Sequence, residues 1–488
     1  MTLKNIGTRE AAAALRKVDS MSNPRVHSLQ AQARCFKLGL TLILSVVVTA
    51  PDWAQTTPPS TSQGAAPPKT WIDPDTGHRV TRLSEEPDSK ALYFNKNAYT
   101  RDGKDMIYFS PVGIHDLNLA TLQSRTLWQG HVVALLVGTR TRKVFFRKFG
   151  DPHLSVIDID AMAVQTLGLL PRRAELGSIN ADETKIAGTY VEGTNPDYSD
   201  FELKELQDEA KALRESHQQA VETHARALVV PDAEGQAKSV AMEKTLAAHI
   251  PQDLFVMDIS TGKTTVILKG TDWLNHVQFS PTDPTLIMYA HEGPPLEVDR
   301  IWTIRSDGSH NQSILPRVNA TDSITHEFWS HDGATIWYDF QSPKGHHYFL
   351  GGYDVATGNR RLVPMKTVEA SLHFNVSFDG KLFCGDGDKP GHSDKAAHGQ
   401  TTLNKQWLWI KELLPPNQDS ISSEGRSYTG RFHSEPLVSM SKHNYNKLEP
   451  NARLSPDGKL VIFNSNMFGP TYVFAVEVKK ETPSVATN

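Results

Sequence analysis

Polar side chains that could act in acid–base or metal chemistry recur in this 488-residue chain at one fixed spacing. His326 and His373 each stand six residues before the Asp of a Ser-x-Asp-Gly turn, and Asn451 stands at the same distance before a third such turn. His276 belongs to a related segment and stands four residues before its Ser, as the other three do. Side chains that share one register lie at equivalent points of successive repeats. Repeats arranged around an axis would therefore bring these four polar groups together.

The turn that follows these residues recurs along the chain, each time after a short hydrophobic strand. Its copies begin at Thr100, Asn180, Ser280, Ser330, Ser377 and Ser455. Short strands separated by Asn, Asp, Gly and Pro indicate antiparallel sheet. A weaker unit over residues 132–167 keeps the strand pattern without the turn. With this unit, the chain has about seven repeats of about four strands, which predicts an all-β fold, a seven-bladed β-propeller.

Two segments modify this simple ring. Residues 70–84 have the ending of a repeat without its beginning, so we expect them to supply the outer strand of the last blade and leave no free sheet edge. From about residue 200 to 249 the sequence is rich in Glu, Lys, Ala and Leu and lacks strand alternation. This composition predicts two helices inserted in the fourth repeat. Their charges fit a solvated face, and a lid over the axial site is the alternative.

The N-terminal region predicts export. Residues 1–54 have the character of a signal peptide, since an apolar run at 38–48 follows basic residues and is too short to span a bilayer comfortably. Met21 is an alternative start, because the stretch before the apolar run is long for a signal. Residues 55–69 form a linker rich in Pro, Ser and Thr, and residues 70–488 form the propeller. We expect a periplasmic or secreted protein with no membrane attachment after signal cleavage.

Composition agrees with a globular protein of this kind. With 39% hydrophobic residues and a formal charge of −4, the chain can bury a sizeable core and has no charge excess that would favour nucleic acid. Of the two cysteines, Cys35 would leave with the signal peptide. Cys384 is then unpaired, and we expect it to be a small core residue.

A dense group of motifs resembles a known family. His276-Val-Gln-Phe-Ser-Pro, His291-Glu-Gly-Pro, Val298-Asp-Arg-Ile-Trp and His326-Glu-Phe-Trp occur in this order. They resemble the oligogalacturonate lyases, seven-bladed propellers that cleave pectin-derived oligosaccharides by β-elimination. The resemblance is densest over residues 273–339 and continues more weakly over most of the rest of the mature chain.

The resemblance assigns roles to particular residues. β-Elimination from a uronate removes the proton on C5 and expels the oxygen on C4, so the site must hold a base and neutralise the carboxylate. The resemblance implies His326 as the base and Arg300 as the assisting group. A divalent metal, usually manganese, would bind the uronate carboxylate with His373 as one ligand. We expect His276 and His291 to contact the substrate, a short uronic-acid oligosaccharide.

The predicted metal site departs from the family pattern. Family members carry Gln-x-x-His-x-His before the last turn, whereas this chain has Asn446, Glu449 and Asn451 at those positions. Oxygen donors suit a hard divalent ion, so manganese is expected by resemblance while calcium and magnesium stay open. His443 is an alternative ligand. Without a metal, Glu449 would place a negative charge where the uronate carboxylate should lie, which would argue for another substrate.

Other interpretations of these residues stay open. Each histidine could instead cap its strand, and Arg300 could form a structural ion pair with Glu297 or Asp299. The alternative to a lyase is a non-catalytic periplasmic propeller that binds or scaffolds other molecules through its axial face. A propeller attached to a serine peptidase is excluded, because the chain has no Gly-x-Ser-x-Gly motif.

Overall fold

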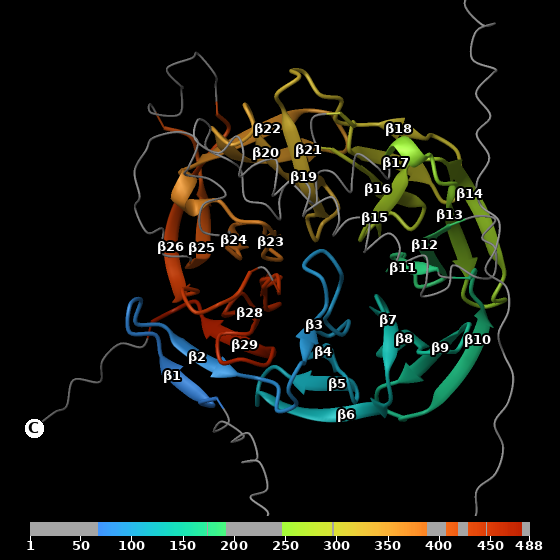
Figure 1. Ribbon diagram of the computed structural model, residues 1–488, viewed down its shortest axis with the longest axis horizontal. Coiled ribbons are helices and arrows are strands. Elements are labelled where there is room, and N and C mark those ends of the chain that lie inside the picture. Colours follow the sequence, from blue (N-terminus) through green and yellow to red (C-terminus); the bar gives the residue numbers. More distant parts are fainter. Residues whose placement is uncertain are drawn as a thin grey trace, which may run out of the picture. The chain divides into compact units, whose positions relative to one another are not determined.

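The computed structural model describes residues 67–172, 174–191, 246–294, 297–387, 407–417, 428–445 and 447–480. These residues form seven antiparallel sheets, the blades, which surround a central axis (Figure 1). The prediction of an all-β seven-bladed propeller is therefore confirmed.

The first three blades contain four strands each. Blade 1 consists of β3 (Lys90–Ala91), β4 (Asp105–Ser110), β5 (Gly113–Asn118) and β6 (Gln123–Gln129). Blade 2 consists of β7 (Val132–Val137), β8 (Lys143–Lys148), β9 (His153–Asp158) and β10 (Val164–Leu169). Blade 3 consists of β11 (Glu175–Ile179), β12 (Lys185–Val191), β13 (Gln252–Asp258) and β14 (Thr264–Gly270).

The next three blades repeat this order from the innermost strand outwards. Blade 4 consists of β15 (Trp273–Phe279), β16 (Leu286–Glu292), β17 (Ile301–Arg305) and β18 (Gln312–Ser313). Blade 5 consists of β19 (Ser323–Trp329), β20 (Thr335–Gln341), β21 (Tyr348–Asp354) and β22 (Arg360–Met365). After the 3-10 turn η1 (Thr367–Glu369), blade 6 consists of β23 (Phe374–Val376), β24 (Leu382–Gly385), β25 (Trp407–Leu414) and β26 (Arg431–Ser439).

Blade 7 joins the two ends of the described chain. It consists of β27 (Arg453–Leu454), β28 (Leu460–Ser465), β29 (Tyr472–Glu477), and the N-terminal strands β2 (Arg79–Arg82) and β1 (Thr70–Ile72). Val80 pairs with Val476 across β2 and β29. The expected closure of the ring is thus confirmed, and the N-terminal segment supplies two outer strands where one was expected.

The recurring turn is stabilised by its own polar side chains. In blade 5 the hydroxyl of Ser330 donates to Asp332 at 2.6 Å and accepts from the backbone N–H of Thr335 at 2.9 Å. Gly333 follows with a φ of 69°, a left-handed conformation that glycine adopts without steric strain. Because the same residues recur in blades 6 and 7, the motif marks one end of the axial channel, which we call the turn end.

Apolar side chains on neighbouring blades form the cores between them. One cluster combines Ile107 of blade 1, Leu135 and Phe146 of blade 2, and Ile462 of blade 7, all of them buried. Full burial of such a side chain stabilises the fold by roughly 1.5–3 kcal/mol. Cys384 lies in another of these clusters, buried and without a disulfide, as expected.

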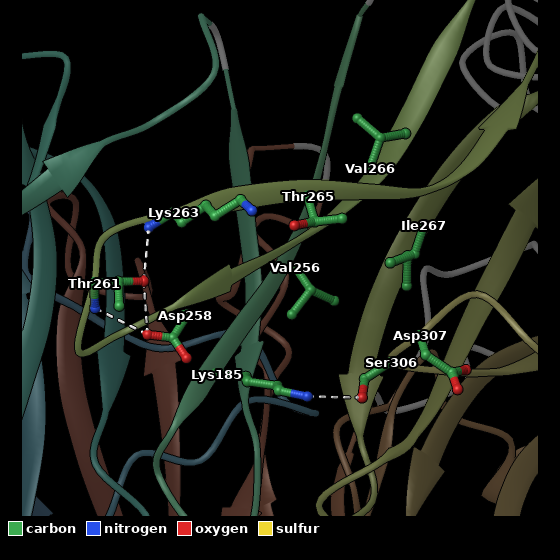
Figure 2. Close-up of a pocket in the computed structure, with 10 residues that line it drawn as sticks. All are labelled: Lys185, Val256, Asp258, Thr261, Lys263, Thr265, Val266, Ile267, Ser306 and Asp307. Carbon is green, nitrogen blue, oxygen red and sulfur yellow. Dashed lines mark hydrogen bonds between the residues drawn. The ribbon is translucent and has the colours of Figure 1, made fainter.

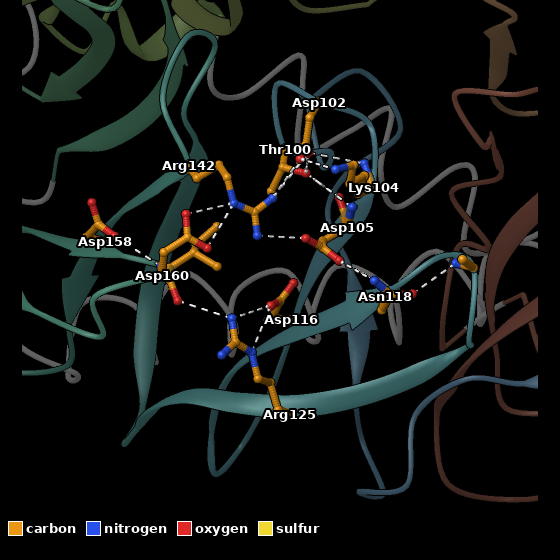
Figure 3. A network of polar contacts seen from close by, with 12 residues as sticks. Thr100, Asp102, Lys104, Asp105, Asp116, Asn118, Arg125, Arg142, Asp158 and Asp160 are labelled. Atoms are coloured by element: carbon orange, nitrogen blue, oxygen red, sulfur yellow. Dashed lines mark hydrogen bonds and ion pairs between the residues drawn. The ribbon is translucent and has the colours of Figure 1, made fainter.

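A polar network joins blades 1 and 2 near the surface (Figure 3). The guanidinium of Arg142 contacts carboxylates of Asp102, Asp105 and Asp160 at 2.8–3.1 Å. Arg142 comes from the β7–β8 turn, whereas Asp102 and Asp105 come from blade 1. The network therefore fixes how these two blades pack.

The innermost strand of blade 1 opens into a loop. Ala91 pairs with Tyr108, and Tyr99 forms a bridge with Met106 on the same strand, β4. Residues 92–98, between these two pairings, therefore loop out of the sheet. Figure 1 shows this loop after β3, projecting into the centre of the ring. We call residues 92–98 the axial loop.

Several predictions concern residues that the structure does not describe. The signal peptide, most of the linker and most of the helical insertion lie outside the described residues. Of residues 200–249 only 246–249 are described, and residues 246–248 are helical. The insertion point between β12 and β13 belongs to blade 3, so the predicted placement in the fourth repeat is wrong. None of the helices described is long and apolar enough to cross a membrane.

Candidate functional site

His276 and His326 lie at bulges in the innermost strands of blades 4 and 5. The pairing register shifts between residues 275 and 278 of β15, and between residues 325 and 328 of β19. Both histidines have a positive φ, 50° and 53°. This conformation is uncommon for such residues and is found where the surrounding structure holds it, often at functional sites. The bulge re-aims each side chain at the end of the channel where the inner strands begin.

The other two register residues lie at the same end of the channel, the strand-start end. His373 directly precedes β23, and Asn451 precedes β27 with a φ of 53°. The rings of His326 and His373 are 4.8 Å apart between centroids. The shared spacing in the sequence thus corresponds to a shared position in four consecutive blades.

The axial loop contributes aromatic side chains between these histidines. The ring of Tyr93 lies 5.5 Å from that of His276 and 5.2 Å from that of His373. Phe94 packs on His373 with a centroid distance of 4.5 Å. Sequence reasoning missed Tyr93, because the axial loop leaves the repeat and its residues carry no register signal.

Blade 7 holds the axial loop in place. The buried guanidinium of Arg453 donates hydrogen bonds to the backbone carbonyl oxygens of Leu92, Tyr93 and Lys96. Asn451 accepts a hydrogen bond from the backbone N–H of Phe94 at 3.2 Å. The side-chain oxygen of Asn451, a predicted metal ligand, therefore positions the axial loop.

A chain of charges connects blades 4 and 5. Arg300 Nε donates to Glu327 Oε2 at 2.8 Å, and its Nη1 lies 3.7 Å from Glu292 Oε1. The other oxygen of Glu327 lies 2.9 Å from His276 Nδ1. Arg300 thus has ion pairs, but with Glu327 and Glu292, so the alternative of a pair with Glu297 or Asp299 does not describe its contacts.

Both central members of this chain are buried and charged. Burial would lower the pKa of Arg300, but the adjacent carboxylates of Glu327 and Glu292 outweigh burial and raise it. Burial would likewise raise the pKa of Glu327, yet the charges of Arg300 and His276 lower it well below its usual range. One arginine thus faces two carboxylates, and His276 contacts one of the two.

His373 is held by a second carboxylate. Its Nδ1 lies 2.7 Å from Asp386 Oδ2, and its backbone N–H donates to Asp386 Oδ1 at 2.9 Å. Because a carboxylate accepts hydrogen bonds, Nδ1 carries the proton and Nε2 presents its lone pair. That lone pair accepts from the hydroxyl of Tyr93 at 3.1 Å, and Glu449 Oε2 lies 3.7 Å from the same nitrogen.

The hydroxyl of Tyr93 keeps its proton at neutral pH. Burial raises its pKa, and the negative charge of Glu449 raises it further. A phenol in this environment donates hydrogen bonds and does not act as a base. Tyr93 is therefore a fixed hydrogen-bond donor beside the rings of His276 and His373.

His291 lies at the edge of this group. It ends the second strand of blade 4, where Nδ1 contacts Asp272 Oδ2 at 3.0 Å and the ring packs on Trp302 with a centroid distance of 4.7 Å. Burial lowers its pKa, and Asp272 opposes this effect. The backbone N–H of His291 donates to the carbonyl of Arg300 at 2.9 Å. The structure thus places His291 beside the arginine, on the rim.

The predicted metal ligands do not all meet. His373 and Glu449 lie close together, whereas the side-chain oxygen of Asn451 is engaged by the axial loop and Asn446 lies outside the described residues. Both ring nitrogens of His443 have partners, Ser465 Oγ at 3.0 Å and the Leu448 carbonyl at 2.8 Å. Among the residues described, no group of three His, Cys, Asp or Glu side chains could hold a metal. These side chains therefore do not by themselves fit a manganese site.

A small pocket of about 300 Å³ lies away from the histidines, between blades 3 and 4 (Figure 2). Lys185 donates to Ser306 Oγ at 3.2 Å across it, and Asp258 and Lys263 line its outer part. None of the predicted site residues lines this pocket. It therefore does not belong to the candidate site.

Comparisons with known proteins identify relatives of the C-terminal half. Residues 246–482 match the profile of a family described as oligogalacturonate lyase. The oligogalacturonate lyase of Dickeya dadantii is 26% identical over 227 residues, which cover 46% of this chain and 55% of that protein. The oligogalacturonide lyase of Pectobacterium atrosepticum is 25% identical, with the same shares covered. The chain thus spans about half the length of the curated relatives it matches.

Solved structures extend the likeness in fold over more of the chain. An oligogalacturonate lyase in complex with manganese has a TM-score of 0.62 and 21% identity, covering 84% of this chain and 96% of that one. The oligogalacturonate lyase of Vibrio parahaemolyticus has a TM-score of 0.63 with the same identity and shares covered. At this identity the structures support the fold, and the sequence match supports the family. Residues 246–482 of this chain, which contain His276, Arg300, His326 and His373, are similar to the oligogalacturonate lyase family.

Proposed function

We propose that this protein is a polysaccharide lyase that cleaves short uronate oligosaccharides, such as oligogalacturonates, by β-elimination. The observation that carries the proposal is the meeting of His276, His326 and His373 from consecutive blades beside Arg300. All four residues belong to the segment that matches the lyase family. A scaffold would have no need of this arrangement.

In the proposed reaction, His326 takes the proton from C5 of the uronate. The electron pair of the broken C–H bond forms the C4–C5 double bond, and the bond from C4 to the leaving oxygen breaks. The leaving oxygen must gain a proton, which we assign to water, because the pKa of Tyr93 is raised and its proton is shared with His373 Nε2. Arg300, buried and charged, supplies a fixed positive charge near the carboxylate of the intermediate.

The charge balance of the site explains why cations should be tested. Arg300 is already paired with Glu327 and Glu292, so a further positive charge would strengthen the attraction of a uronate carboxylate. Manganese, and calcium or magnesium in its place, remain predictions from the resemblance. No step of the proposed reaction depends on them.

A decisive experiment follows the unsaturated product of β-elimination by its ultraviolet absorbance, with digalacturonate and trigalacturonate as substrates. We expect activity in the native protein and a loss of about 100-fold or more in His326→Asn, because general-base catalysis contributes about that much. Asn is chosen because Asn451 already adopts the same positive φ in the same register.

The matched control for this variant is His153→Asn, a half-exposed histidine of β9. It should leave the rate unchanged. Equal rates for native protein and His326→Asn would contradict the role of His326. No product from any uronate oligomer would overturn the lyase proposal.

The same assay tests the metal. Activity lost with a chelator and restored by manganese would support the cofactor that the resemblance implies. Activity that is unchanged by the chelator and by manganese would overturn that prediction. The protein's own side chains would then be sufficient for the reaction.

The alternative, a non-catalytic binding or scaffolding propeller, has one observation in its favour. The functional groups of Arg300, His276 and His373 are all paired within the chain, as structural residues would be. This alternative predicts binding of uronate oligomers without formation of product, which the absorbance assay separates from catalysis.

Export and the helical insertion are proposals that rest on the sequence. Fractionation of cells that express the full chain should place the protein in the periplasm or the medium. Retention in the cytoplasm would contradict the signal peptide at residues 1–54.

A further inference from the structure

A cavity of about 500 Å³ occupies the turn end of the axial channel, on the other side of the axial loop from the histidines. Its wall includes Phe328 and Gln278, which follow His326 and His276 by two residues along the inner strands. None of His276, His326, His373 and Arg300 lines it. The cavity is therefore separate from the candidate active site. Its volume falls within the range of about 300–1,000 Å³ that is usual for small-molecule sites.

Several basic side chains line this cavity, and Glu175 interacts with one of them, Lys96, from outside the cavity wall. Arg101, Arg140, Lys96 and Arg453 line it, and none of the described residues in its wall is Asp or Glu. Arg101 and Arg140 are exposed at the mouth, and neither forms an ion pair with another described residue. Their guanidinium groups are therefore free to bind an anion, with the planar geometry that suits a carboxylate.

Arg453, which is more buried than Arg101 and Arg140, adds to the positive charge of the cavity. Arg453 is 2% exposed, its hydrogen-bond partners are backbone carbonyls, and its Nε has no partner among the described atoms. Burial lowers its pKa, since no carboxylate lies beside it to offset burial. The nearby carboxylates are engaged by other groups: Asp332 accepts from Ser330, Asp457 accepts from Ser455, and Glu183 accepts from the backbone N–H of Arg140 at 2.7 Å.

An aromatic platform lies at the same mouth. The rings of His331 and Phe378 stack with a centroid distance of 3.7 Å and an angle of 8° between their planes. Phe378 is 54% exposed and is therefore accessible to a ligand. Burial lowers the pKa of His331, and its Nε2 is engaged with the carbonyl of Val376 at 3.0 Å. The stack is thus flat and neutral, a surface on which the apolar face of a sugar ring can pack.

We propose that this cavity is a second binding site for a small acidic sugar, a monosaccharide or disaccharide that carries a carboxylate. The carboxylate binds between Arg101 and Arg140, and the ring packs on Phe378. Buried amides add hydrogen-bond donors for hydroxyl groups, since Asn95 Nδ2 also has no partner among the described atoms. The proposal does not require that β-elimination takes place at the other end of the channel.

The test uses the full chain carrying His326→Asn, so that no ligand is consumed. Isothermal titration calorimetry with galacturonate should show binding that is weakened about tenfold or more in R101Q/R140Q, since two charge-assisted contacts are lost. The control R360Q/R431Q removes the same charge from exposed positions on β22 and β26 and should bind as before. Phe378→Ala should also weaken binding.

Two further ligands test separately whether the cavity binds the carboxylate and the sugar ring. Galactose lacks the carboxylate and inorganic phosphate lacks the ring, so both should bind at least tenfold more weakly than galacturonate. Equal binding of phosphate would overturn the sugar part of the proposal, and equal binding of galactose would overturn the anionic part. Galacturonate binding that is absent, or unchanged in R101Q/R140Q, would overturn the site itself. The absorbance assay on the native protein reports separately on the lyase function.

Discussion

The axial loop lies between the two ends of the axial channel, and the two ends differ in the charged side chains that line them. At the strand-start end, Arg300 is paired with the carboxylates of Glu327 and Glu292. At the turn end, Arg101 and Arg140 have no ion pair among the described residues, and no described Asp or Glu lines the cavity. The axial loop separates the two, since Tyr93 contacts the histidines and Lys96 lines the cavity.

This difference teaches that a cluster of charges is not by itself a site. Arg142 has three aspartate partners in the network of Figure 3, yet it joins two blades at the surface, and the network drawn there contains no histidine. Arg300 has fewer partners but is buried beside His276 and a strained backbone. Burial and neighbouring chemistry distinguish a candidate site from a structural ion pair.

The largest effect is expected at the strand-start end. Arg300→Gln should lower the free energy of unfolding by about 3–5 kcal/mol, because it leaves Glu327 buried without its counter-charge. Urea unfolding measures this loss. Arg142→Gln, at a partly exposed network, should lose only about 1 kcal/mol. Equal losses would show that burial does not separate the two clusters.

A substitution of Arg453, which holds the axial loop, should affect both ends of the channel. Arg453→Met removes the hydrogen bonds that hold three carbonyls of the axial loop, so we expect a loss of about 2 kcal/mol in unfolding free energy. Both the lyase rate and galacturonate binding in the cavity should fall. If one function falls and the other is untouched in a folded variant, the loop does not couple the two ends.

Acid should weaken the strand-start end through Glu327. The pKa of this carboxyl is lowered from its ordinary value of 4.5 by Arg300 and His276, which outweigh burial. Its stabilising contribution is therefore present above about pH 4.5 and is lost as the pH falls toward the lowered folded pKa, by at most about 1.4 kcal/mol per pH unit. Urea unfolding at several pH values should show the difference between native protein and Glu327→Gln shrinking in acid. The exposed Glu412→Gln serves as the control, and a difference that grows in acid would contradict the assignment.

The smallest effect is expected from one hydroxyl. Tyr93→Phe keeps the ring between His276 and His373 but removes the hydrogen bond to His373 Nε2, so stability should fall by about 1 kcal/mol. The lyase rate should fall as well, because the hydrogen bond that orients His373 is gone. Galacturonate binding in the cavity, measured by calorimetry, should stay unchanged, and a large change there would contradict the separation of the two ends.

Much of the fold was predictable because its signals are local. The Ser-x-Asp-Gly turns are closed by hydrogen bonds within five residues, as between Ser330 and Thr335, so their sequence reveals them directly. The closure of blade 7 was predictable from an incomplete repeat at residues 70–84. The placement of the insertion in the fourth repeat was wrong, because β12 and β13, which flank it, pair within the sheet of blade 3.

The candidate site was predictable only in part. The register of His276, His326 and His373 placed them at one end of the channel before any coordinates, since equal spacing in repeats means equal position in blades. Their partners were not predictable. Glu292, Asp386 and Tyr93 share no pattern with the histidines they accompany.

The sequence by itself determined the repeats, the turns, the register of the polar residues and the similarity of residues 246–482 to the lyase family. Only the tertiary structure decided which charges face one another and that the axial loop divides the channel. The physical reason is distance along the chain: Tyr93 and His373 are 280 residues apart, yet their side chains lie 3.1 Å apart. Such contacts arise from closure of the ring, which no local pattern records.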